Sequence, residues 1–456
     1  MLTWVVGGTV GWCVAATLAL IASIKFHGPG FLADNSWLTY GRVRVAATQV
    51  GWWGAVLPVV FGVLLGWLGR LARNGMAYPW LALLGGALWH LGSLVTLLGI
   101  LSGATTGYEA WGLPRQAVWV YAGGFVLYLV SFLATWHDRR ERSLEPAHWY
   151  VLSGVLWMGW SAATAFVLLD LKPVRGVTQA VVDGWFGANA WLLAGTLMGL
   201  GLMHGWWPRV AGRPVYSRNL AILAFAGLLV FGGWTGIAPS APVPAWLPVT
   251  STVATIFCVV PWVAEWLNWR GTMAGWRARL REAPAGWFLW WARAGFLAAA
   301  AAKLALHVPG LDRVLEQTWW DPARQWAQAH GFLGLAGVAG FYAWLREERL
   351  PGGWAGWVRW HGYCMVTGGL LLVLSLAAAG LVQGLAWRDT ALSNVAVLQR
   401  TLMWLRLSTV GELLWWLGVV LFGWSLIGMT VRWWVGCWRS WWMRVTRPVA
   451  LQEATE

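Results

Sequence analysis

Residues 360–382, WHGYCMVTGGLLLVLSLAAAGLV, form a run of 23 positions without Asp, Glu, Lys or Arg. A helix needs about 20 mostly apolar residues to cross the ~30 Å hydrocarbon core of a bilayer. This run therefore predicts a membrane-spanning helix, and with it an all-α, polytopic membrane fold. Ten similar segments precede it and one follows. The twelve expected spans are residues 2–24, 46–69, 79–102, 116–136, 148–169, 185–204, 219–238, 247–267, 287–306, 327–345, 360–382 and 409–431.

The composition excludes a soluble protein. Hydrophobic residues make up 59% of the chain and charged residues 11%, whereas a soluble domain has about 25% charged residues. The net charge of +14 comes from basic residues in short loops, without a basic face or run, so no nucleic-acid partner is expected. We expect one transmembrane domain over residues 1–456, with a short cytoplasmic tail from about residue 432.

Basic residues are distributed unequally between the two sides of the predicted membrane domain. The even-numbered loops and the C-terminal tail hold nineteen Arg, whereas the odd-numbered loops hold eleven basic residues. Because Lys and Arg gather in cytoplasmic loops, both termini are expected to face the cytoplasm. The first segment has few charges in front of it and is too long for a cleavable signal, so it is expected to remain as a span.

Several sequence blocks occur in an order and at a spacing that match a known family. They are IKFHGPGFL and SWLTYGRVR within Ile24–Arg44, LGILSGATTGYEAWGLP at Leu98–Pro114, GRPVYSRNL at Gly212–Leu220 and LVQGLAWRD at Leu381–Asp389. Over nearly its whole length the chain resembles subunit I of cbb3-type cytochrome oxidases, in the haem-copper oxidase superfamily. The resemblance implies twelve helices that hold a low-spin haem, a high-spin haem and a copper ion on six histidines, and cytochrome c oxidase activity.

This sequence departs from the implied ligand set at five of the six positions. Ala47 stands at the low-spin haem position on the second helix, and Ala188 at the copper position on the sixth. Ala238 and Pro239 stand at the two copper positions on the seventh helix. Since alanine and proline side chains cannot coordinate a metal, oxygen reduction at a haem-copper centre is excluded by this alignment.

The remaining two positions lie in WAQAHGFLG, Trp326–Gly334, at the start of the tenth span. The resemblance implies an HxH pair here, and we align it with His330 and Phe332. His330 would then be the remaining high-spin haem ligand, and Phe332 would replace the second low-spin ligand. The family's reaction-site tyrosine falls on Gly232. We expect no metal and no cofactor, with one haem b on His330 as the alternative.

Three ionisable residues lie within or near spans. Lys303 is at membrane depth, where an ammonium costs roughly 2.5–3.5 kcal/mol on insertion scales. We expect Lys303 to extend outward or to neutralise a carboxylate, and we expect Glu265 and Glu412, near helix ends, to have similarly structural roles. The remaining seven histidines are expected to be hydrogen-bonded structural residues. Two alternatives are open for a vacated cofactor pocket: side chains fill that space, or lipid or quinone occupies it.

Three functional hypotheses follow. In the first, the chain is a pseudo-enzyme: a structural subunit of a respiratory complex in the bacterial inner membrane. An intact subunit I paralogue and membrane-anchored cytochrome c subunits would be its partners. The second hypothesis is a haem-binding terminal oxidase or nitric oxide reductase-like subunit that uses His330. The third is a proton or ion conduit through Lys303, Glu265 or Glu412.

Overall fold

The computed structural model describes residues 1–140, 143–275, 284–347 and 355–445. Within these residues, each of the twelve predicted spans falls on one helical unit. The first six units are α1 (Leu2–His27), α2–η2–α3 (Tyr40–Gln49, Val50–Val56, Leu57–Leu71), α4 (Pro79–Ser102), α5 (Arg115–His137), α6–η3 (Pro146–Ala165, Phe166–Leu171) and α7–η4–α8 (Val177–Phe186, Gly187–Ala194, Gly195–Ala211).

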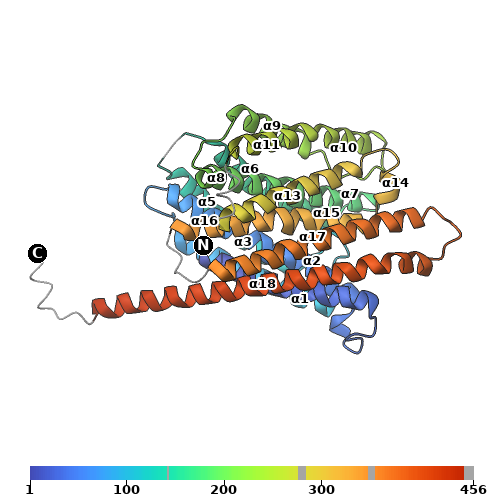
Figure 1. Cartoon of the computed structure of the whole chain (residues 1–456), viewed down its shortest axis with the longest axis horizontal. Coiled ribbons are helices and arrows are strands. Elements are labelled where there is room, and N and C mark those ends of the chain that lie inside the picture. Colours follow the sequence, from blue (N-terminus) through green and yellow to red (C-terminus); the bar gives the residue numbers. More distant parts are fainter. Residues whose placement is uncertain (141–142, 276–283, 348–354, 446–456) are drawn as a thin grey trace, which may run out of the picture.

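The second half of the chain repeats this pattern of long helices and short connections. Its units are α9 (Arg218–Gly232), α10–α11 (Trp246–Phe257, Val259–Thr272), α13 (Pro284–Ala305), α15–η5–α16 (Trp320–Trp326, Ala327–Gly334, Leu335–Glu347), α17 (Ala355–Ala386) and α18 (Asn394–Val445). Two short helices, η1 (Ser36–Leu38) and α14 (Asp312–Leu315), lie in connections. The helices run side by side as one bundle (Figure 1).

Nine helices in the described part of the chain are long and apolar enough to cross a membrane. The other three predicted spans fall on α9, α13 and α15–η5–α16, which are shorter or less apolar. The predicted all-α, membrane-spanning fold is confirmed. The last helix continues from the predicted span into the predicted tail as far as Val445, and α18 projects beyond the bundle (Figure 1). Residues 446–456 of that tail lie outside the described residues.

Two units form the centre of the bundle. The most apolar windows of Tyr40–Leu71 and Val177–Ala211 are 78% and 89% buried, whereas those of the other seven membrane helices are 33–50% buried. Both central units are interrupted by a π-helical segment, η2 and η4. A third such segment, η5, packs against both of them. Such segments widen a helix locally and often occur at functional sites, so the centre of the bundle is the place to look for one.

Tryptophan contributes much of the bulk of this core. Trp4 donates its indole N–H to the Ala82 carbonyl at 2.8 Å, and Trp89 donates to the Trp53 carbonyl at 2.6 Å. The buried tryptophans whose indole N–H has no partner among the described residues are Trp12, Trp52, Trp53, Trp67, Trp191, Trp206, Trp207, Trp269 and Trp291. These rings stabilise the bundle by area and shape, since an indole buries a large apolar surface even without its hydrogen bond.

Candidate functional site

Two neighbouring cavities lie around the π-helical segments η2, η4 and η5. The first, called the His330 cavity, has a volume of ≈ 270 Å³ and is lined by α1, α2, η2, η5, α17 and α18. The second, called the Lys303 cavity, has a volume of ≈ 260 Å³ and is lined by η4, η5, α13 and the loop after α9. Trp52 and Trp191 line both cavities, and their ring centroids are 5.5 Å apart.

His330 enters the first cavity between three tryptophans. Its ring centroid lies 5.4 Å from that of Trp326, 5.8 Å from that of Trp12 and 5.9 Å from that of Trp415. Its Nδ1 atom is buried without a hydrogen-bond partner. The ring approaches η2 at Gly51, where an added Cβ would lie 3.4 Å from the imidazole Cε1 and Nε2 atoms. The ring therefore lies within van der Waals reach of the η2 backbone.

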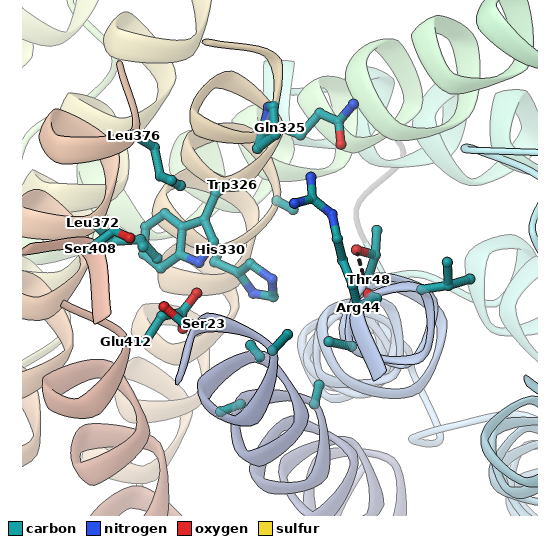
Figure 2. Close-up of a pocket in the computed structure, with 18 of the residues that line it drawn as sticks. Ser23, Arg44, Thr48, Gln325, Trp326, His330, Leu372, Leu376, Ser408 and Glu412 are labelled. Atoms are coloured by element: carbon teal, nitrogen blue, oxygen red, sulfur yellow. Dashed lines mark hydrogen bonds between the residues drawn. The ribbon is translucent and has the colours of Figure 1, made fainter. Parts of the chain in front are cut away.

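Ala47 and His330 line the same cavity. In the view of Figure 2, the Glu412 carboxyl and the Arg44 side chain lie on either side of the His330 ring. Glu412, on α18, has no hydrogen bond or ion pair among the described residues. Arg44 donates to the Tyr40 hydroxyl at 2.8 Å and stacks over the Trp319 ring at 4.7 Å. The cavity thus combines apolar walls with a few ionisable groups.

Phe332 lies on a different face from the one implied by the aligned HxH pair. It is fully buried, its ring centroid is 5.1 Å from that of Phe296, and it lines neither cavity. An added Cβ at Gly199 would lie 2.5 Å from its ring. Two residues along a helix correspond to a turn of about 200°, so His330 and Phe332 point in nearly opposite directions. Phe332 therefore does not share the cavity that Ala47 lines.

The residue two positions before His330 faces the other cavity. Gln328 lines the Lys303 cavity together with Ala188, Ala238 and Pro239. Its side chain is 4% exposed and donates to Thr196 Oγ1 at 2.9 Å. The sequence alignment missed Gln328 because a glutamine does not stand out among expected histidines.

Lys303, on α13, also lines this second cavity. Its ammonium donates to Thr235 Oγ1 at 2.7 Å. Among the described residues, the neighbouring ionisable groups that act on it are the Cys258 thiol and the Arg324 guanidinium. Lys303 therefore neither extends outward to the lipid surface nor neutralises a carboxylate, in contrast to the expectation from the sequence.

The haem and copper implied by the resemblance can be tested against these residues. The described part of the chain holds no group of three or more His, Cys, Asp or Glu that could bind a metal ion. The Lys303 cavity offers one imidazole, His307, where copper would need several nitrogen or sulfur donors. The residues present do not fit a copper ion.

A haem held by two axial histidines does not fit the first cavity either. His330 offers one imidazole, but Ala47 offers no second ligand. The cavity therefore lacks the ligand pair that a low-spin haem with two axial histidines needs.

A buried polar cluster lies apart from both cavities. Glu265, on α11, accepts from His204 Nε2 at 3.1 Å on each carboxylate oxygen, and the Tyr150 hydroxyl donates to it as well. Glu265 is fully buried, His204 is 5% exposed and Tyr150 is fully buried. The sequence indicated a structural role for Glu265 but not these partners, because they come from three separate helices. The cluster ties α6, α8 and α11 together.

The other histidines are mostly hydrogen-bonded, as expected. His361 pairs with the Tyr342 hydroxyl at 2.6 Å, and His27 with the Thr409 hydroxyl at 3.0 Å. His148 Nδ1 accepts from the Glu145 backbone N–H, which closes the N-terminus of α6. These histidines are already bonded within the fold.

Asp183 closes one end of the Lys303 cavity by binding a loop. Its carboxylate accepts from the backbone N–H groups of Trp111 at 2.8 Å, Glu109 at 3.0 Å and Ala110 at 3.2 Å. In addition, the Trp111 indole donates to Asp170 at 2.6 Å. One side chain thus satisfies three consecutive donors of a loop that forms a wall of both cavities.

We expect Asp183→Asn to lower the free energy of unfolding by about 1–3 kcal/mol, because an amide retains one acceptor oxygen and leaves buried N–H groups without a partner. Thermal unfolding followed by tryptophan fluorescence measures this loss. Asp389→Asn is the matched control: Asp389 accepts one exposed local bond, so its loss should stay within about 0.5 kcal/mol. Equal losses in the two variants would contradict the role given to Asp183.

Comparisons with known proteins agree with this fold. The sequence model of the family described as "Cytochrome C and Quinol oxidase polypeptide I" matches residues 1–414. A relative from Azorhizobium caulinodans, named cytochrome c oxidase subunit 1 homolog, is 26% identical over 83% of this chain and 71% of its own length. The cbb3-type cytochrome c oxidase subunit CcoN1 of Stutzerimonas stutzeri is 24% identical over 83% of this chain and 82% of its own length.

A solved structure shows the same fold. The cryo-EM structure of a heme-copper terminal oxidase dimer superimposes with a TM-score of 0.69 over 93% of this chain and 84% of that chain, at 16% identity. The names of the relatives place them in multi-subunit oxidases. The chain is membrane-spanning and all-helical, and because the family match covers residues 1–414, it belongs to the cytochrome c and quinol oxidase polypeptide I family, as a haem-copper oxidase subunit I-like protein.

Proposed function

We propose that this chain is a non-catalytic subunit I homologue, a structural subunit of a respiratory membrane complex. One observation carries the proposal: Ala188, Ala238 and Pro239 line one cavity with Gln328 and Lys303, and the described residues offer no set of metal donors in place of histidines. Oxygen reduction in this family requires a metal centre, so a scaffold that keeps the fold without the ligands has a role other than that chemistry.

The charge of the Lys303 cavity supports this proposal. A buried ammonium repels a metal cation, and the repulsion is stronger in a membrane interior than in water. Lys303 thus places an ammonium group in the cavity where the resemblance implies copper. An ammonium there disfavours metal binding in addition to the absence of ligands.

The proposal also concerns which two residues of the tenth span correspond to the family's HxH pair. We propose that the HxH pair corresponds to Gln328 and His330, two residues earlier than the aligned pair. His330 shares its cavity with Ala47, and Gln328 shares its cavity with Ala188. In this register the remaining histidine is the low-spin one, and Gln328 replaces the high-spin ligand. Each redox site has then lost at least one essential ligand.

The proposed setting is the bacterial inner membrane, with both termini on the cytoplasmic side. The uneven distribution of Arg supports this orientation. An intact subunit I paralogue and membrane-anchored cytochrome c subunits are the proposed partners, since the relatives are named as oxidase subunits.

A haem-binding subunit is the second candidate function, and His330 is the observation that favours it. The imidazole lines a cavity and makes no hydrogen bond to another described side chain. The proton or ion conduit has less support. Lys303 and Glu412 lie in different cavities, and Glu265 lies in the buried cluster with Tyr150. The three residues therefore do not form one path.

We expect the chain, expressed without partners and purified in detergent, to contain no stoichiometric copper and no stoichiometric haem b. Pyridine haemochrome spectra measure the haem, and inductively coupled plasma mass spectrometry measures the copper. A His330→Ala variant is the control for adventitious haem. Stoichiometric haem b that disappears in this variant would establish the second candidate function, and stoichiometric copper would overturn the proposal.

A further inference from the structure

Lys303 stands out because its positive charge has no anionic partner among the described residues. Thr235 Oγ1 accepts from its ammonium, and the Thr235 hydroxyl itself donates to the Gly232 carbonyl at 2.8 Å. That threonine is neutral, and the two ionisable neighbours of Lys303 are a thiol and a guanidinium. Ion pairs or polar partners normally accompany a lysine at membrane depth. Two of its three N–H groups therefore remain for something in the cavity.

The other charged groups that line the Lys303 cavity have hydrogen-bond or ion-pair partners of their own. Arg324 pairs with Asp321 at 2.9 Å, and Asp183 accepts three backbone N–H groups. Glu109 accepts from Gln325 and Glu316 accepts from Ser240, both at exposed positions, where water and salt screen their charge.

His307 adds no second charge. Its ring makes hydrogen bonds to the Lys303 carbonyl at 3.0 Å and to the Thr255 hydroxyl at 3.4 Å. Burial lowers the pKa of the His307 imidazole, and the nearby ammonium lowers this pKa further, so His307 is neutral at pH 7. Of the two cations that line the cavity, Arg324 has an ion-pair partner among the described residues, whereas Lys303 has none.

The remaining walls leave space for a small ligand. Where the resemblance implies bulky imidazoles, the cavity has Ala188, Ala238 and Pro239, and its volume is ≈ 260 Å³. An anion that accepts the free N–H groups of Lys303 would form a charge-assisted hydrogen bond. The single unpaired ammonium and the modest volume favour a small ion of single charge.

We propose that the Lys303 cavity binds a small monovalent anion, of the carboxylate or halide class, on the Lys303 ammonium. This site is separate from any haem on His330. The proposal does not depend on the structural role given above, because an anion could occupy this cavity whether or not the chain takes part in catalysis.

Formate and chloride are the probes for this site. The purified full chain is titrated with either sodium salt at constant ionic strength, with sodium gluconate as the replacement because its anion is larger. Thermal unfolding followed by tryptophan fluorescence reports binding, since a ligand of the folded state raises the transition temperature in a saturable way. Isothermal titration calorimetry gives the dissociation constant. We expect Lys303→Met to weaken binding by at least about tenfold, because the charge is lost.

The controls separate this charge from other effects. Lys172→Met removes an exposed lysine and should bind as the unaltered chain does. Lys303→Arg keeps the charge and should retain binding. Lys303→Gln is a second uncharged variant in case Lys303→Met does not fold. A saturable shift with formate but not with chloride would identify a site for organic carboxylates. A saturable shift with both salts would identify a general anion site. No saturable shift with either salt, or an equal shift in both uncharged variants, overturns the proposal.

Discussion

Glu265→Ala is expected to lower the free energy of unfolding by about 3–5 kcal/mol, the cost of removing one partner from a buried pair. Glu265 accepts from both His204 and Tyr150, and all three side chains are buried where α6, α8 and α11 meet. Without the carboxylate, the imidazole would lack its partner in an apolar interior, and the phenol would keep only its hydrogen bond to the Ala221 carbonyl at 3.3 Å. Each unsatisfied group costs about 1–3 kcal/mol.

Denaturation by SDS in mixed micelles measures this loss. Glu265→Gln is the conservative variant: its amide oxygen still accepts one bond, so it should lose less than half as much stability as Glu265→Ala. Glu316→Ala is the matched control, because Glu316 makes one exposed hydrogen bond and its removal should change stability by less than about 0.5 kcal/mol. A Glu265→Ala variant as stable as the control would show that the cluster does not hold these helices together.

Phe332→Ala is expected to cost about 3–5 kcal/mol, the usual range for truncating a buried phenylalanine. Its ring fills the space between α8 and α13, next to Phe296 and against Gly199. His330→Ala should cost less, about 1 kcal/mol, because His330 borders a cavity and makes no hydrogen bond to another described side chain.

The comparison of these two variants tests their different environments. Both are measured by the same mixed-micelle denaturation, and Phe332→Leu serves as the control that keeps most of the buried volume. If His330→Ala were the more damaging variant, Phe332 would not have the packing role described here. The proposed register of the Gln328 and His330 pair would then lose its support.

Much of the fold was predictable from the sequence. Runs such as residues 360–382 specify a helix by themselves, because a single segment can satisfy its own backbone hydrogen bonds inside a bilayer only as a helix. The span limits were less accurate where helices continue past the hydrocarbon core. For example, α18 runs from Asn394 to Val445, although the apolar pattern indicates residues 409–431.

The candidate site was less predictable. The sequence indicated which positions of the family pattern lack histidine, and the structure groups Ala188, Ala238 and Pro239 around one cavity. The sequence did not indicate which side of the helix carries Phe332 and which carries Gln328. Successive residues of a helix are rotated by about 100° around its axis. A shift of two positions in an alignment therefore exchanges one side of the helix for the other. Three π-helical segments change this phase further.

The sequence by itself determined that the chain is a helical membrane protein and that it resembles one family. It also predicted that alanine and proline occupy ligand positions of that family. Apolar length and residue chemistry are local properties, and they do not depend on neighbours in space. Only the tertiary structure decided which side chains meet. Lys303 contacts Thr235, 68 positions away in the chain, and Glu265 contacts Tyr150, 115 positions away. Such contacts depend on how whole helices pack, and no local pattern encodes that packing.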